Sequence, residues 1–72
     1  MRIIAIIEGN DHEGYGCWVE ETMPYCNPVG QGDTLEECKK DFLQCLDEIQ
    51  EWGLEDGVDI PRVTEIEWRI AS

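Results

Sequence analysis

The sequence is poor in positive charge. It holds 5 lysine and arginine residues against 17 aspartate and glutamate residues, which gives a formal net charge of -12. A chain with this balance repels the phosphate backbone of nucleic acids and the anionic surface of a membrane. We therefore expect no direct nucleic-acid or membrane contact, and a basic protein is the simplest partner. High acidity can also do no more than keep a protein soluble. The charge by itself therefore does not decide between a basic partner and solubility alone.

Long apolar segments are missing as well. The stretch RIIAII at residues 2–7 is too short for the apolar region of a signal peptide. No apolar run approaches the roughly 20 residues that span a bilayer. We therefore expect a cytoplasmic protein with reduced cysteines.

Histidine is nearly absent, and no Cys-x-x-Cys pair occurs, so a zinc site is not expected. The four cysteines are Cys17, Cys26, Cys38 and Cys45. Cys38 and Cys45 lie seven residues apart on a predicted helix, about 10 Å along its axis, which is too far for a disulfide. We interpret the thiols as buried structural residues.

The glycines of GQGDTLEEC, residues 30–38, raise the question of a phosphate-binding loop. Three carboxylates, those of Asp33, Glu36 and Glu37, crowd the start of the helix that follows. No lysine of the phosphate-binding type comes after the second glycine. We therefore predict a structural junction here, with no cofactor and no metal.

The 72 residues form a single domain, residues 1–72, with a small core. Apolar and alternating patterns predict strands at 2–9, 15–20, 29–32 and 64–70. A hairpin loop at 9–14 joins the first two, and an irregular proline-containing connection at 23–28 precedes the third. The expected fold is α+β in the order β-β-β-α-β, with one helix covering one face of a small mixed sheet.

The helix carries the clearest signals. Thr34 suits the N-cap, and Glu37 completes a capping box in which its carboxylate reaches back to the Thr34 amide. We expect Trp52 to extend the apolar stripe of the helix, and Gly53 to end the helix in the left-handed conformation. The stripe recurs at three- and four-residue steps and consists of Leu35, Cys38, Phe42, Cys45, Leu46 and Ile49.

The order and the amino-acid sequences of these segments resemble those of the HicB-like antitoxin family over nearly the whole chain. The resemblance rests on RIIAIIE, GNDHEG, YGCWVEE, MPYCNP and GDTLEEC, in which Cys38 stands where the family usually has alanine. It implies a degenerate ribonuclease-H-like module that binds and blocks a small basic mRNA-cleaving toxin, HicA. Many members add a C-terminal DNA-binding domain. This sequence stops at Ser72, so we do not expect autorepression by this chain alone.

Four residues are candidates for partner binding. Tyr15 and Trp18 could serve as aromatic anchors, but they could equally be core residues, and we expect at least one of them in the core. Glu20 and Glu21, together with the polar side of the helix, could meet lysine and arginine on a toxin. Alternation along residues 15–20 places Tyr15 on one face of the strand and Trp18 and Glu20 on the other. Any exposed sheet edge also favours a homodimer or a higher oligomer.

A metal-dependent nuclease is the alternative that the ribonuclease-H likeness suggests. Its ions would need converging carboxylates, for which Glu8, Glu20 and Glu67 are the candidates on or near strands. A nuclease must also attract a polyanion, and this surface repels one. We therefore expect a binding module and not an enzyme.

Overall fold

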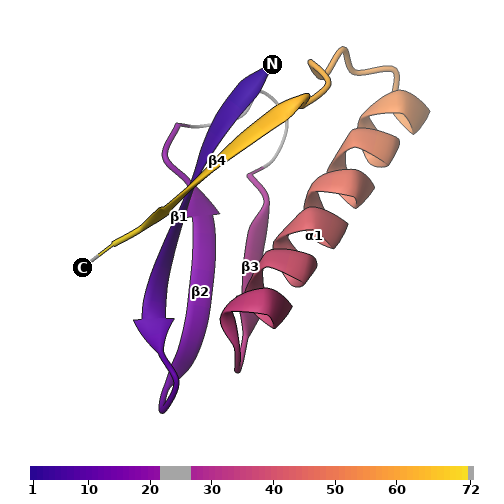
Figure 1. The fold of residues 1–72 in the computed structure, drawn as a ribbon. Helices are drawn as coiled ribbons and strands as arrows, with labels where there is room; N and C mark the ends of the chain where they lie inside the picture. Colours follow the sequence, from indigo (N-terminus) through magenta and orange to yellow (C-terminus); the bar gives the residue numbers. More distant parts are fainter. Residues whose placement is uncertain (22–26, 72) are drawn as a thin grey trace.

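The computed structural model describes residues 1–21 and 27–71 (Figure 1). Its elements are β1 (Arg2–Asn10), β2 (Gly14–Val19), β3 (Val29–Gly32), α1 (Leu35–Glu55) and β4 (Glu65–Ile70). Together they confirm the predicted α+β fold and its β-β-β-α-β order. Most of the predicted irregular connection, residues 23–26, lies outside the described residues.

The four strands form one mixed sheet in the order β3-β2-β1-β4. β1 pairs antiparallel with β2, and β2 pairs antiparallel with β3, whereas β4 returns parallel to β1 on its other side. β1 is therefore a central strand, as its β-branched run indicates. Its alternate residues Ile3, Ala5 and Ile7 are buried on the side that faces the helix.

The core lies between this face of the sheet and α1, which covers it from one side (Figure 1). Phe42, at the centre of the helical stripe, is fully buried and meets the ring of Trp68 edge-on, with the centroids 5.4 Å apart. The other buried side chains of α1 are Cys38, Leu46 and Ile49. The predicted stripe is thus the face that packs against the sheet. Within the described residues, no helix combines the length and the apolar character that crossing a membrane requires.

Two glycines of β3 let the backbone of α1 come unusually close to the sheet. A Cβ atom on Gly30 would lie 2.6 Å from the Cys38 carbonyl oxygen and 2.6 Å from the Phe42 nitrogen. A Cβ atom on Gly32 would lie 2.8 Å from the Cys38 nitrogen. Such distances are far inside van der Waals contact, so only glycine fits at these positions.

The start of the helix has the predicted cap with one changed partner. The Glu37 amide donates to the Thr34 hydroxyl at 3.1 Å, as expected. The Glu37 carboxylate, however, accepts from the Asp33 amide at 3.3 Å, one residue before the predicted donor. The carboxylate still satisfies an amide at the helix entrance.

The end of the helix differs from the prediction. Gly53 lies inside α1 and is buried, because the chain after the helix folds back and packs Ile60 against it. A Cβ atom on Gly53 would lie only 2.2 Å from the Cδ1 atom of Ile60. Trp52 consequently points outward and is 50% exposed. The helix continues to Glu55, and Gly57 adopts the left-handed conformation at φ +71°. The predictions for Trp52 and Gly53 were therefore wrong.

Gly30→Ala should push α1 off β3 and lower the free energy of unfolding by about 1–3 kcal/mol, as overpacking does. Gly16→Ala is the matched control, because a Cβ atom there has nothing within 4 Å. It should change stability by no more than about 0.5 kcal/mol. Urea denaturation followed by far-UV circular dichroism measures both. Equal effects of the two substitutions would contradict the close approach of helix and strand.

Candidate functional site

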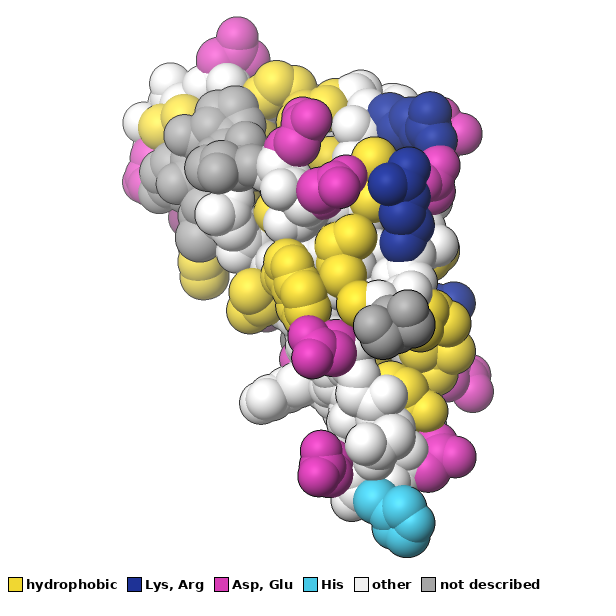
Figure 2. Space-filling view, turned by 90° about the vertical axis from the view of Figure 1, so that its left-hand side faces the viewer, with side chains coloured by type: hydrophobic (Ala, Val, Ile, Leu, Met, Phe, Trp, Pro, Cys, Tyr) yellow, Lys and Arg dark blue, Asp and Glu magenta, His cyan; other side chains and the backbone are white. Residues whose placement is uncertain are grey.

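The face of the sheet turned away from α1 has no helix over it in the described part of the chain, and Figure 2 looks onto this side. We call it the open face. Because side chains alternate across a strand, it presents the residues whose neighbours face the core. Its residues are Arg2, Ile4, Ile6, Glu8, Gly16, Trp18, Val29, Gln31, Glu65, Glu67 and Arg69.

An apolar strip crosses the open face. The strand register places Ile6 beside Trp18, and Trp18 beside Val29. Trp18 is 38% exposed and Val29 is 57% exposed, while Ile4 and Ile6 are half-buried. Figure 2 shows apolar side chains across the middle of this side, with carboxylates around them. We call Ile4, Ile6, Trp18 and Val29 the apolar strip. A contiguous apolar patch with a polar rim is typical of an interaction site.

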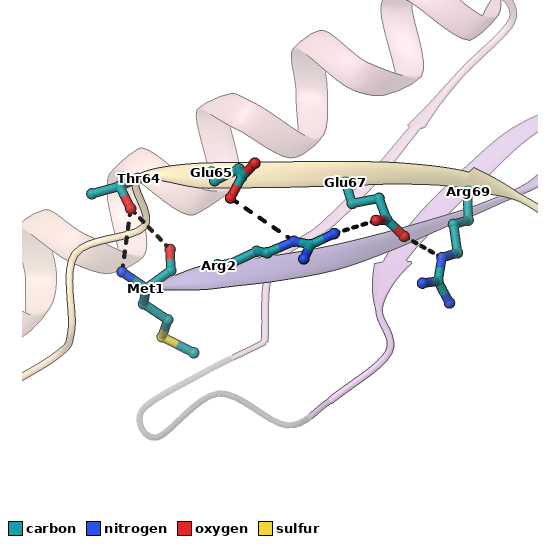
Figure 3. Close-up of polar contacts among 6 residues, drawn as sticks. All are labelled: Met1, Arg2, Thr64, Glu65, Glu67 and Arg69. Carbon is teal, nitrogen blue, oxygen red and sulfur yellow. Dashed lines mark hydrogen bonds and ion pairs between the residues drawn. The ribbon is translucent and has the colours of Figure 1, made fainter.

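A cluster of ion pairs borders the strip at β1 and β4 (Figure 3). The two carboxylate oxygens of Glu67 accept hydrogen bonds from the guanidinium groups of Arg2 and Arg69. Arg2 also lies 3.9 Å from Glu65, and Arg69 lies 3.8 Å from Glu20. The hydrogen bond from Arg69, with the positive charges of Arg69 and Arg2, holds the pKa of Glu67 below its ordinary range. Each exposed pair adds little stability, but together they fix the orientation of both arginines.

The N-terminus holds β4 in place beside this cluster. The Met1 amino group donates to the Arg62 carbonyl at 2.9 Å, and the Thr64 amide donates to the Met1 carbonyl at 2.9 Å. A cavity of about 230 Å³ opens next to this junction. Its lining includes Glu21 and Arg69, so Glu21 stands at the border of the open face.

The structure brings together three of the four residues predicted for partner binding. Trp18 lies on the open face, Glu20 lies 3.8 Å from Arg69 of that face, and Glu21 borders it. Tyr15 lies on the helix side, packed against the core, and its hydroxyl donates to Asp11 at 2.8 Å, which raises the pKa of the phenol.

Sequence reasoning missed Ile4, Ile6, Val29 and the two arginines as parts of this surface. The alternation of β1 was the available signal for the isoleucines, since half of an all-apolar strand must face away from a single helix.

Two of the cysteines are core residues. Burial raises the pKa of the Cys17 thiol to about 12, with a further contribution from Cys38, whose thiol shares a hydrogen bond with it. Burial likewise raises the pKa of Cys38. Both thiols are buried, as predicted, and their raised pKa keeps them protonated at neutral pH. Cys45 is free and half-buried, and Cys26 lies outside the described residues.

The carboxylates considered for a nuclease do not converge. Among the described residues, no group of three or more histidine, cysteine or acidic side chains could hold a metal ion. Glu67 instead directs both of its oxygens to arginines.

Comparison with known proteins yields no match: no family model, no curated protein and no solved structure matches the chain. The resemblance to HicB-like antitoxins therefore stays a prediction that rests on the sequence segments alone.

Glu67→Gln should remove a pH-dependent part of the stability. Because the folded pKa of Glu67 is depressed, its contribution is present above the unfolded pKa and disappears as the pH falls through the folded value. Wild type should thus be more stable than Glu67→Gln at neutral pH, and the difference should shrink as the pH is lowered below the ordinary range of a glutamate pKa.

Urea denaturation over this pH range provides the measurement. Glu51→Gln removes the same charge from the exposed side of α1 and serves as the control for net charge. A difference between wild type and Glu67→Gln that stays constant with pH would contradict the role of the arginines.

Proposed function

We propose that this chain is a protein-binding module whose open face receives a small basic protein. The observation that carries the proposal is the apolar strip, in which Trp18 is 38% and Val29 is 57% exposed, on a chain of net charge -12 with exposed glutamates beside it. Burial of the apolar strip against a partner is favourable in free energy, and the glutamates can form ion pairs with lysine and arginine of the partner.

The two parts of this surface have different tasks. Trp18 presents a rigid ring at the centre of the strip, between Ile6 and Val29, where aromatic anchors contribute most to affinity. The exposed carboxylates of Glu8, Glu20 and Glu21 lie outside the strip. Charges in such a rim raise the association rate and exclude acidic competitors more than they add affinity.

The resemblance to HicB-like antitoxins supports a specific partner, a basic mRNA-cleaving toxin of the HicA kind. An enzyme that cleaves RNA needs a positively charged surface to hold its substrate. An acidic protein that occupies this surface competes with RNA for the same cations. Neutralisation by occupation requires no chemistry from the binding module.

The test is binding to the small basic protein encoded by the adjacent gene, measured by calorimetry and by surface plasmon resonance. Trp18→Ala should raise the dissociation constant at least about tenfold, as the loss of a central aromatic anchor does. Trp52→Ala is the matched control, because this tryptophan is also exposed but lies on α1, away from the open face. It should leave the affinity unchanged.

Two further readouts separate the outcomes. Added salt should slow association with the wild-type chain, since it screens the rim charges. The wild-type chain, and not Trp18→Ala, should block RNA cleavage by the partner at equimolar concentration. The absence of a small basic neighbour, or equal binding by both tryptophan variants, would contradict the proposal.

A further inference from the structure

The two edges of the sheet differ in how far they are covered by the rest of the described chain. At β3, the Gln31 amide donates to the Asp41 carboxylate of α1 at 3.0 Å, so the helix covers that edge. At the other edge, β4 pairs with β1 and with no other strand of the described chain. In Figure 1, β4 crosses in front of β1. An unprotected strand edge is a template for pairing with another chain.

The backbone groups that β4 offers at this edge follow from its pairing with β1. The Ala71 amide donates to the Ile7 carbonyl at 2.7 Å, so Ala71 faces β1. Backbone groups alternate in direction along a strand, so every second residue before Ala71 also faces β1. The remaining residues, Ile66, Trp68 and Ile70, direct their amide and carbonyl groups outward.

We propose that two copies of this chain associate through β4, antiparallel and centred on Trp68, and join their four-stranded sheets into one of eight strands. In this register Trp68 opposes Trp68 of the second copy, and Ile66 opposes Ile70. All three residues use their outward groups, so each is a hydrogen-bonded pair of the antiparallel type. The proposal concerns the edge of the sheet and does not depend on which partner binds the open face.

The charged side chains favour this register over those centred on Ile66, Glu67 or Arg69. Centring on Trp68 places Glu67 of each copy opposite Arg69 of the other copy, which gives two pairs of opposite charge. Glu65 then lies opposite Ala71. Centring on Ile66 would oppose Glu65 to Glu67. Centring on Glu67 or on Arg69 would oppose two copies of that residue. Opposite charges stabilise cross-strand pairs, and like charges destabilise them.

The same register covers apolar surface on the helix side. Ile70 is 68% exposed although its side chain alternates with core residues, and the pairing sets it against Ile66. Ile66 and Trp68 also line a groove of about 580 Å³ between α1 and β4, together with Leu43 and Leu46. The second copy would bring its own Trp68 and Ile70 to the mouth of this groove.

Electrostatics favours self-association at this edge over other parts of the surface. The chain carries a net charge of -12, so two copies repel each other in general. Around β4, however, the positive Arg2 and Arg69 balance the negative Glu65 and Glu67. The edge is thus locally neutral, and a second copy can approach it with the least repulsion.

Sedimentation equilibrium in about 0.15 M NaCl, where the screening length is about 8 Å, tests the interface. Wild type should be a dimer at micromolar concentration, and Ile70→Asp should raise its dissociation constant at least about tenfold, because Ile66 of each copy loses its apolar partner. Leu54→Asp is the matched control, since Leu54 is 76% exposed but lies at the end of α1. A monomeric wild type, or a dimer that both variants leave intact, would overturn the proposal.

A charge exchange tests the register itself. Glu67→Arg alone opposes arginines across the interface, and Arg69→Glu alone opposes glutamates, so each variant should dimerise at least about tenfold more weakly than wild type. Mixed together, the two variants should form a heterodimer, in which every pair is again of opposite charge. Circular dichroism confirms that both are folded. Folded variants that fail to form the heterodimer would refute pairing centred on Trp68.

Discussion

The close contact between α1 and β3 determines how the rest of the surface is divided. Gly30 and Gly32 remove the Cβ atoms that would hold the helix away, and the helix backbone settles directly on the strand. Asp41 is thereby brought to the Gln31 amide and closes that edge of the sheet. Because the helix is held over β3, its contact with β4 runs through the side chain of Trp68, and a groove remains between them. One covered edge and one open edge follow from the same contact.

The few cations of this acidic chain are concentrated where they change the character of the surface. Arg2 and Arg69 meet at Glu67, so the β4 side of the open face is balanced in charge. The Lys39 ammonium lies over the ring of Trp68, 5.3 Å from its centroid. The surface therefore divides into an acidic part with an apolar strip, suited to a basic partner, and a neutral edge, suited to a second copy. The two proposed contacts use different physical forces and do not require each other.

Local patterns predicted most of the fold. Alternation separated Tyr15 from Trp18, and the capping signal located the helix start, because both depend on residues within a few positions of each other. The end of the helix was predicted wrongly, because spacing alone does not tell whether Trp52 or Gly53 faces the core in the last turns of the helix. Ile60 decided between them by packing on Gly53, a contact made by the chain after it has folded back.

Sequence patterns alone predicted the α+β composition, the order of the elements and the face of α1 that is buried, because helix periodicity and strand alternation are short-range properties. The tertiary structure decided which residues share a surface. Arg2 reaches Glu67 across 65 positions of sequence, and Ile6 meets Trp18 through the strand register. Such register is set by packing of the whole sheet against one helix, so neither the apolar strip nor the neutral edge can be located from local patterns.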